Sequence, residues 1–271
     1  MDVYGGIVSS VYNSSRPQYL PPRFIIELGG HFNVPVFQAS GHLQDYFTFK
    51  DYGLVQGIGF HLNVKYAANK KANIFPYLTF GFCQLQNNDD GLAFIDSNSI
   101  QSGYPLPGNT VYHSTPGNSL LAMRIFNLGL GVQYYFSTRH HLLPFAGVEV
   151  DYNRIWGFYE QQPYAPTGNG TKEKTTFNFV PASRIGMGID AGLDYRINDN
   201  LGFLCGIKFK LANLFGKSSE KTNPASVASG DLNKLPLLDA SATDLNSNLS
   251  SSRNITYFEF YLGFSIFVGR R

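Results

Sequence analysis

The sequence predicts an all-β fold, an eight-stranded antiparallel up-and-down transmembrane β-barrel with short periplasmic turns and long extracellular loops. Three observations predict it: a composition that favours strands, eight segments in which apolar and polar residues alternate, and connections that alternate between short and long. Of the 271 residues only 15% are charged, whereas 15% are aromatic and 28 are glycine. This composition argues against a disordered chain, a coiled coil or a helical bundle.

Eight segments carry the alternation that a strand with two different faces requires, because successive side chains of a strand point to opposite sides. They span about residues 23–36, 52–67, 74–86, 121–137, 143–159, 183–197, 201–215 and 255–268.

In each of the first four segments the apolar residues stand at every second position and so form a row on one face of the strand. In the first segment Phe24, Ile26 and Leu28 alternate with Glu27 and Gly29. The apolar rows of the next three are Ile58, Phe60, Leu62 and Val64, then Leu78, Phe80 and Phe82, then Phe126, Leu128, Leu130 and Val132.

The last four segments follow the same rule, with more charges on the second face. In the sixth segment Ile185, Met187 and Ile189 alternate with Arg184 and Asp190. The apolar rows of the fifth, seventh and eighth are Ala146, Val148, Val150 and Tyr152, then Phe203, Cys205, Ile207 and Phe209, then Phe258, Phe260, Leu262 and Phe264.

A water-soluble sheet also alternates, so the competing interpretation is a soluble sandwich or lipocalin-like barrel with its apolar face inward. The predicted strands run to about 13–16 residues, above the usual mode of about 5–6, whereas a tilted membrane strand needs about 9–11 residues plus its interfacial ends. Most glycines lie on the polar face, which suits the crowded interior of a narrow barrel. We therefore predict that the apolar face contacts lipid.

The lengths of the connections predict the orientation. Short connections follow the second, fourth and sixth strands, whereas long polar connections follow the odd strands over about residues 37–51, 87–120, 160–182 and 216–254. Bacterial outer-membrane barrels have short periplasmic turns and long extracellular loops, so both termini are expected in the periplasm.

The eight strands, the alternating connections and the closing segment from Tyr257 to Val268 resemble the small eight-stranded outer-membrane barrels. These include the OmpA transmembrane domain, OmpX and the outer membrane beta-barrel proteins of Bacteroidota-like bacteria. The resemblance covers about residues 23–269 and implies location in a bacterial outer membrane. It rests on pattern and implies architecture more than function.

Charged side chains of nearly balanced sign fall on the inward faces. Bulk water cannot solvate charges inside an eight-stranded barrel, so we predict a paired network that fills the lumen as a structural plug; a gated pore or proton path is the alternative. The network comprises Glu27, Lys65, Glu149, Asp151, Arg184, Asp190, Asp194, Arg196, Lys208, Lys210 and Glu259.

Candidate chemical sites are few. His31 and His61 both point inward from neighbouring strands, but no third ligand stands at a supporting spacing. His113 and Ser114 are adjacent in a long loop, where no acidic residue can be placed to orient them as base and nucleophile. We predict no metal site, no cofactor and no enzymatic activity.

The expected partners follow from location and charge. Residues 1–22 are interpreted as a periplasmic arm and residues 23–271 as the barrel. Outer-membrane lipid and lipopolysaccharide are expected to surround the barrel, and other envelope proteins are expected to bind loops 87–120 and 216–254 or the arm. A net charge of +2 without a block of Lys and Arg argues against a nucleic-acid partner.

The predicted function is structural or interactive: envelope integrity, surface attachment, or service as an accessory subunit of an outer-membrane complex. A narrow transport channel is the first alternative, and a lipid-modifying outer-membrane enzyme is the second.

Overall fold

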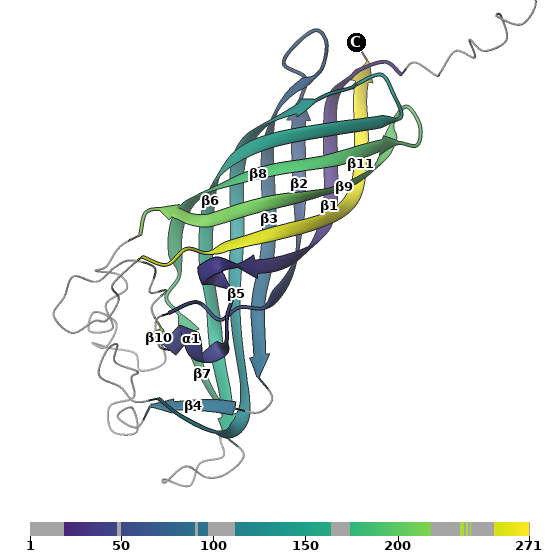
Figure 1. Ribbon diagram of the computed structural model, residues 1–271. Helices are drawn as coiled ribbons and strands as arrows, with labels where there is room; N and C mark the ends of the chain where they lie inside the picture. The colour runs from purple at the N-terminus through teal and green to yellow at the C-terminus, as the bar shows by residue number, and fades with distance from the viewer. Residues whose placement is uncertain are drawn as a thin grey trace, which may run out of the picture.

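The computed structural model contains a closed antiparallel sheet that winds into a tall barrel (Figure 1). The structure describes residues 19–47, 50–89, 92–96, 112–163, 174–217, 234–235, 237, 239 and 252–270. Among these residues no helix has the length and apolarity that a membrane-spanning helix needs.

Eight long strands form the wall, and each pairs with its neighbours in the chain. The sheet closes because β1 pairs with β2 along one edge and with β11 along the other. In order around the barrel the strands are β1 (Pro22–Val36), β2 (Gln56–Tyr66), β3 (Ile74–Asp89), β5 (Tyr112–Tyr135), β6 (Leu142–Pro163), β8 (Ala182–Arg196), β9 (Leu201–Phe215) and β11 (Thr256–Arg270). The predicted eight-stranded up-and-down barrel is confirmed.

The two faces of the wall are sorted as the alternation predicts. On the outer face Leu28, Ile58 and Leu130 are 60%, 69% and 68% exposed. On the inner face their neighbours are buried, and many of these are charged or polar. This inversion of the usual soluble arrangement is the pattern of a barrel whose outer surface contacts lipid.

The two ends of the barrel differ. At one end, called here the turn end, short connections cover residues 67–73, 136–141 and 197–200. At the opposite end, called the loop end, β5 and β6 extend past the other strands (Figure 1). They pair there with the short strands β4 (Leu92–Asp96) and β7 (Thr175–Phe179), and β10 (Lys234–Leu235) adds to β7.

The connection between β1 and β2 folds back over the loop end. It contains a 3₁₀ turn, η1 (Phe37–Ala39), and a short helix, α1 (Leu43–Phe47). The prediction of a strand from residue 52 was wrong for its first residues, because β2 begins at Gln56. Tyr52 and Leu54 are fully buried in the loop-end core, so the apolar residues that suggested a strand serve packing instead.

Two glycines allow the strands to hold a pair of inward histidines. His31 on β1 lies opposite Gly59 on β2, and His61 lies opposite Gly29. A methyl group on Gly59 would collide with the His31 ring and the backbone oxygen of Phe82. The interior at this level therefore tolerates the imidazoles only because the facing positions lack side chains.

We expect Gly59→Ala to lower the free energy of unfolding by about 1–3 kcal/mol through overpacking. Gly30→Ala is the matched control on the outer face, where the nearest atom to an added methyl group is 3.8 Å away. The control is expected to change stability by less than about 0.5 kcal/mol. Urea unfolding in lipid vesicles, followed by the fluorescence of Trp156, measures both; equal stability of the two variants would contradict the packing argument.

Candidate functional site: the charged interior

The inner wall carries all the charged residues that the alternation predicts there. Each of these side chains is at most 6% exposed. They come from six strands: Glu27 on β1, Lys65 on β2, Glu149 and Asp151 on β6, Arg184, Asp190, Asp194 and Arg196 on β8, Lys208 and Lys210 on β9, and Glu259 on β11.

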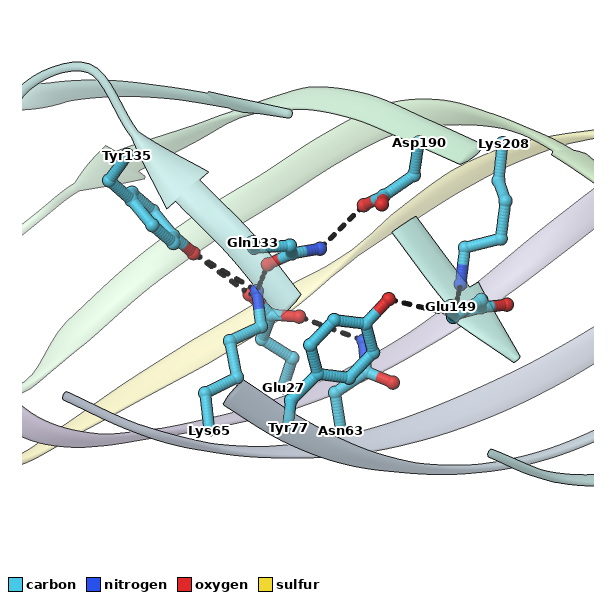
Figure 2. Close-up of polar contacts among 9 residues, drawn as sticks. All are labelled: Glu27, Asn63, Lys65, Tyr77, Gln133, Tyr135, Glu149, Asp190 and Lys208. Atoms are coloured by element: carbon cyan, nitrogen blue, oxygen red, sulfur yellow. Dashed lines mark hydrogen bonds and ion pairs between the residues drawn. The ribbon is translucent and has the colours of Figure 1, made fainter. Parts of the chain in front are cut away.

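The first cluster of the interior surrounds Lys65 (Figure 2). Its ammonium group forms an ion pair with Glu27, donates a hydrogen bond to Gln133, and donates another to the Tyr135 hydroxyl at 3.0 Å. Asn63 donates to the second carboxylate oxygen of Glu27 at 2.9 Å. All three protons of the buried ammonium therefore have acceptors, which is the condition for burying a charge without a large penalty.

The second cluster surrounds Glu149, nearer the middle of the barrel. Lys208 pairs with one oxygen of this carboxylate at 2.7 Å, and Lys210 pairs with the other at 2.8 Å. Tyr77 donates its hydroxyl proton to Glu149 at 2.8 Å, and Lys210 also reaches Asp151 at 2.9 Å. Two lysines and two carboxylates thus share one site, and their formal charges cancel.

Asp190 connects the two clusters. The amide oxygen of Gln133 accepts a hydrogen bond from Lys65, and its nitrogen donates a hydrogen bond to Asp190 (Figure 2). Lys208 lies opposite both Asp190 on β8 and Glu259 on β11, so two further carboxylates flank the lysine that contacts Glu149. Both clusters therefore belong to one polar band across the barrel.

The charged residues nearest the turn end lie among aromatic rings. Arg196 is stacked over Phe267 at 4.4 Å and lies 5.2 Å from the ring of Tyr19. Its guanidinium donates to the backbone oxygen of Leu20 at 3.3 Å. Asp194, two residues earlier on β8, is fully buried at the same end. The last residues before β1 thus pack against the turn end.

Arg184 lies at the loop end, and its partner comes from the last long loop. The guanidinium binds both oxygens of Asp239, at 2.6 and 2.8 Å. Asn213 on β9 also donates to Asp239, at 3.2 Å. A bidentate pair of this kind is stronger than a neutral hydrogen bond. No alternation or spacing in the sequence could have selected Asp239, because it lies in a loop.

Apolar clusters lie on both sides of the polar band. The loop-end cluster combines wall residues such as Leu85 and Leu121 with Tyr52, Leu54 and Leu237 from the connections. The turn-end cluster consists of Ile25, Ala67, Ala72, Phe75, Tyr135, Leu143, Phe145, Leu204, Tyr261 and Phe267. The polar network is therefore enclosed between two apolar layers.

Arg253 holds the loop-end layer in place. Its guanidinium lies 4.3 Å from the centre of the Tyr52 ring and donates to the backbone oxygen of Asp51 at 2.8 Å. Burial raises the pKa of Tyr52 well above its ordinary value, so the phenol is neutral near pH 7. Two loops far apart in the sequence are joined here over the end of the barrel.

The remaining candidates of the sequence have simpler surroundings. The rings of His31 and His61 are stacked with centroids 5.8 Å apart, and His31 bonds to Asn33 at 2.8 Å. In the part of the chain that the structure describes, no group of three or more metal-ligating side chains is present. His113 and Ser114 lie in β5, but their side chains are outside the part that the structure describes. Residues 1–18 and much of loops 87–120 and 216–254 are also outside it.

Part of the chain is similar to one protein family, and the chain is similar to several solved structures at low identity. Residues 105–230 match the model of the Opacity family porin proteins. No curated protein matches the chain. Among solved structures, Neisserial surface protein A is 12% identical, with 90% of this chain and 96% of that chain covered and a TM-score of 0.43. OprG of Pseudomonas aeruginosa is 11% identical, with 93% and 99% covered and a TM-score of 0.40.

The strand register of the chain itself carries the assignment of the fold, since it shows a closed wall of eight strands with an apolar exterior. The match over residues 105–230 spans β5, β6, β8 and β9 of that wall. The chain is a small eight-stranded outer-membrane β-barrel, and its matched segment is similar to the Opacity family porin proteins.

Proposed function

We propose that this protein is a closed structural barrel that anchors and presents its loops at the cell surface, in envelope integrity, surface attachment or an outer-membrane complex. One observation carries the proposal: most charges of the interior form ion pairs, and the charged band is enclosed between two apolar clusters. A conducting pore needs charged or polar groups that face water, whereas these side chains are at most 6% exposed.

The proposed orientation places the loop end outside the cell and the turn end in the periplasm. The short connections of the turn end and the long connections of the loop end support it, because outer-membrane barrels share this asymmetry. The Arg184–Asp239 pair and the Arg253–Tyr52 contact support the presentation of the loops, since the first fastens a loop segment to the wall and the second joins two loop segments to each other. The proposed role requires no catalysis and no cofactor, and its envelope partners would bind the loops or residues 1–22.

The channel alternative is tested by recording currents across planar bilayers that contain the purified protein. We expect no discrete current steps, either for the natural chain or for Arg184→Gln and Glu259→Gln, because removing one charge leaves both apolar clusters in place. Discrete steps in the natural chain that grow in either single variant would overturn the closed barrel.

The structural role of the network is tested at Glu149, which neutralises two lysines. We expect Glu149→Gln to lower the free energy of unfolding by about 3–5 kcal/mol, because it leaves buried positive charge uncompensated. Glu160→Gln is the control: Glu160 pairs with Lys174 at 2.7 Å, but the lysine side chain is 56% exposed, and such pairs contribute about 0–1 kcal/mol. Urea titration in vesicles compares them, and similar losses in both would contradict a structural interior.

A further inference from the structure

The residues that precede β1 lie across the turn end of the barrel. The chain enters β1 there, beside the last residues of β11 (Figure 1). The backbone N–H of Tyr19 donates to the Arg139 oxygen at 3.3 Å, and the Tyr19 hydroxyl lies 3.0 Å from Nδ1 of His141. Both partners belong to the connection 136–141, so residues 19–21, called here the strap, are attached to a neighbouring turn.

Arg196 at the end of β8 is the main contact of the strap inside the barrel. Its guanidinium donates from Nη1 to the Leu20 oxygen at 3.3 Å and lies 5.2 Å from the centre of the Tyr19 ring. The same guanidinium stacks over Phe267 at 4.4 Å. The Arg196 side chain is 1% exposed, so the strap and the turn-end cluster enclose it between them.

The rest of this guanidinium has no hydrogen-bond acceptor among the described residues. Nε and Nη2 of Arg196, which together form an edge that can bind a carboxylate through two hydrogen bonds, are buried without a partner. A buried cation is normally paired and fully hydrogen-bonded. The strap thus satisfies one donor of Arg196 and leaves the bidentate edge unused.

A carboxylate with the same deficiency lies two residues away. Asp194 is fully buried, and neither of its oxygens has a hydrogen-bond partner in the described ranges. Because alternate residues of a strand share a face, Asp194 and Arg196 both point inward, with about 7 Å between their Cα atoms. An arginine side chain is long enough to cover this distance. Two groups of opposite charge therefore lie on one face without a hydrogen bond between them.

Gly202 removes the side chain that would separate the two groups. It is the residue opposite Arg196 in the pairing of β8 and β9. A methyl group on Gly202 would stand 2.7 Å from Oδ1 of Asp194 and 2.9 Å from the Phe267 ring. The carboxylate, the guanidinium and the ring beneath it thus surround one glycine, which permits their close approach.

We infer that the strap is releasable and that Arg196 exchanges partners when the strap leaves. In the docked state Arg196 binds the strap. When the strap is withdrawn, the guanidinium turns to Asp194, forms the ion pair that the docked state leaves unmade, and uncovers the Phe267 ring. The strap continues into residues 1–18, so a pull on that segment acts on Arg196. This exchange goes beyond the proposed function and does not rest on it, because it needs neither a closed interior nor loops at the cell surface.

The contacts of the docked strap suit release. Both hydrogen bonds to its backbone measure 3.3 Å, beyond the usual range of about 2.7–3.2 Å, and Leu20 is 54% exposed. The ion pair available to Arg196 offsets the loss of these contacts, since charge-assisted hydrogen bonds are stronger than neutral ones. A small difference in free energy then separates the two states, as a releasable contact requires.

The test is the mobility of a nitroxide at position 20, recorded by electron paramagnetic resonance of the full chain in lipid vesicles. Leu20→Cys carries the label together with Cys83→Ala and Cys205→Ala, so that no other thiol reacts. We expect a mainly immobile spectrum. The ratio of mobile to immobile label should rise about tenfold in Tyr19→Ala, because the ring and the hydroxyl that hold the strap are lost. An unchanged ratio in Tyr19→Ala would overturn the strap.

The exchange of partners is tested at Asp194. We expect Asp194→Asn, added to Tyr19→Ala, to lower the mobile-to-immobile ratio about threefold, because the released state loses its ion pair whereas the docked state loses no hydrogen bond. Asp199→Asn is the matched control, which removes an equal charge from an exposed position of the adjacent turn and should leave the ratio within about twofold. An equal effect of the two variants, or a higher ratio in Asp194→Asn, would overturn the exchange.

A second pair of variants separates the exchange from simple loosening of the turn end. Arg196→Gln should make the label mobile, because the strap loses its main contact. Adding Asp194→Asn to Arg196→Gln should leave the ratio unchanged, because the exchange needs the guanidinium. A lower ratio on that addition would overturn the exchange. Each variant must migrate more slowly on a detergent gel after boiling, as a folded barrel does, so that a mobile label does not report lost folding.

Discussion

The narrow interior of a closed eight-stranded wall is the constraint on which the rest of the structure depends. Eight inward rows of side chains fill such a barrel, and bulk water has no room to hydrate a charge there. A buried charge is then best compensated by a partner on another strand, as Lys65 is by Glu27 on the adjacent strand and Glu149 is by two lysines that reach it from β9. Ring-bearing residues need space as well, which is why Gly59 faces His31.

The proposed closed interior places the function of the barrel at its surfaces. The loop end is covered by segments that are held by two contacts: Arg184 on the wall binds Asp239, and Arg253 joins its own loop to the loop of Tyr52. The outer face is uniformly apolar along most of its height, and this makes the charged positions Arg124 and Arg154 stand out chemically.

Alternation along the chain predicted the wall well because a strand has only two faces. The inward positions of residues such as Glu27 and Lys210 follow from parity alone, and their burial agrees. The loop residues that contact the buried charges and rings were harder to predict. Asp239 and Arg253 come from a loop without periodicity, and the alternation wrongly placed Tyr52 in a strand. Arg124 and Arg154 did carry a signal, since a charge in an apolar row breaks the alternation, but a search for inward charges passes over them.

The most direct test of the account is a double-mutant cycle between Glu27 and Lys65, a buried pair in which neither residue forms a second ion pair within the described part of the chain. Glu27→Gln, Lys65→Met and the double variant would be unfolded with urea in lipid vesicles, and their free energies of unfolding compared. If buried pairing holds the interior together, the double variant should be less destabilised than the sum of the single variants, with a coupling of about 1–3 kcal/mol. Additive losses within about 0.5 kcal/mol would contradict it.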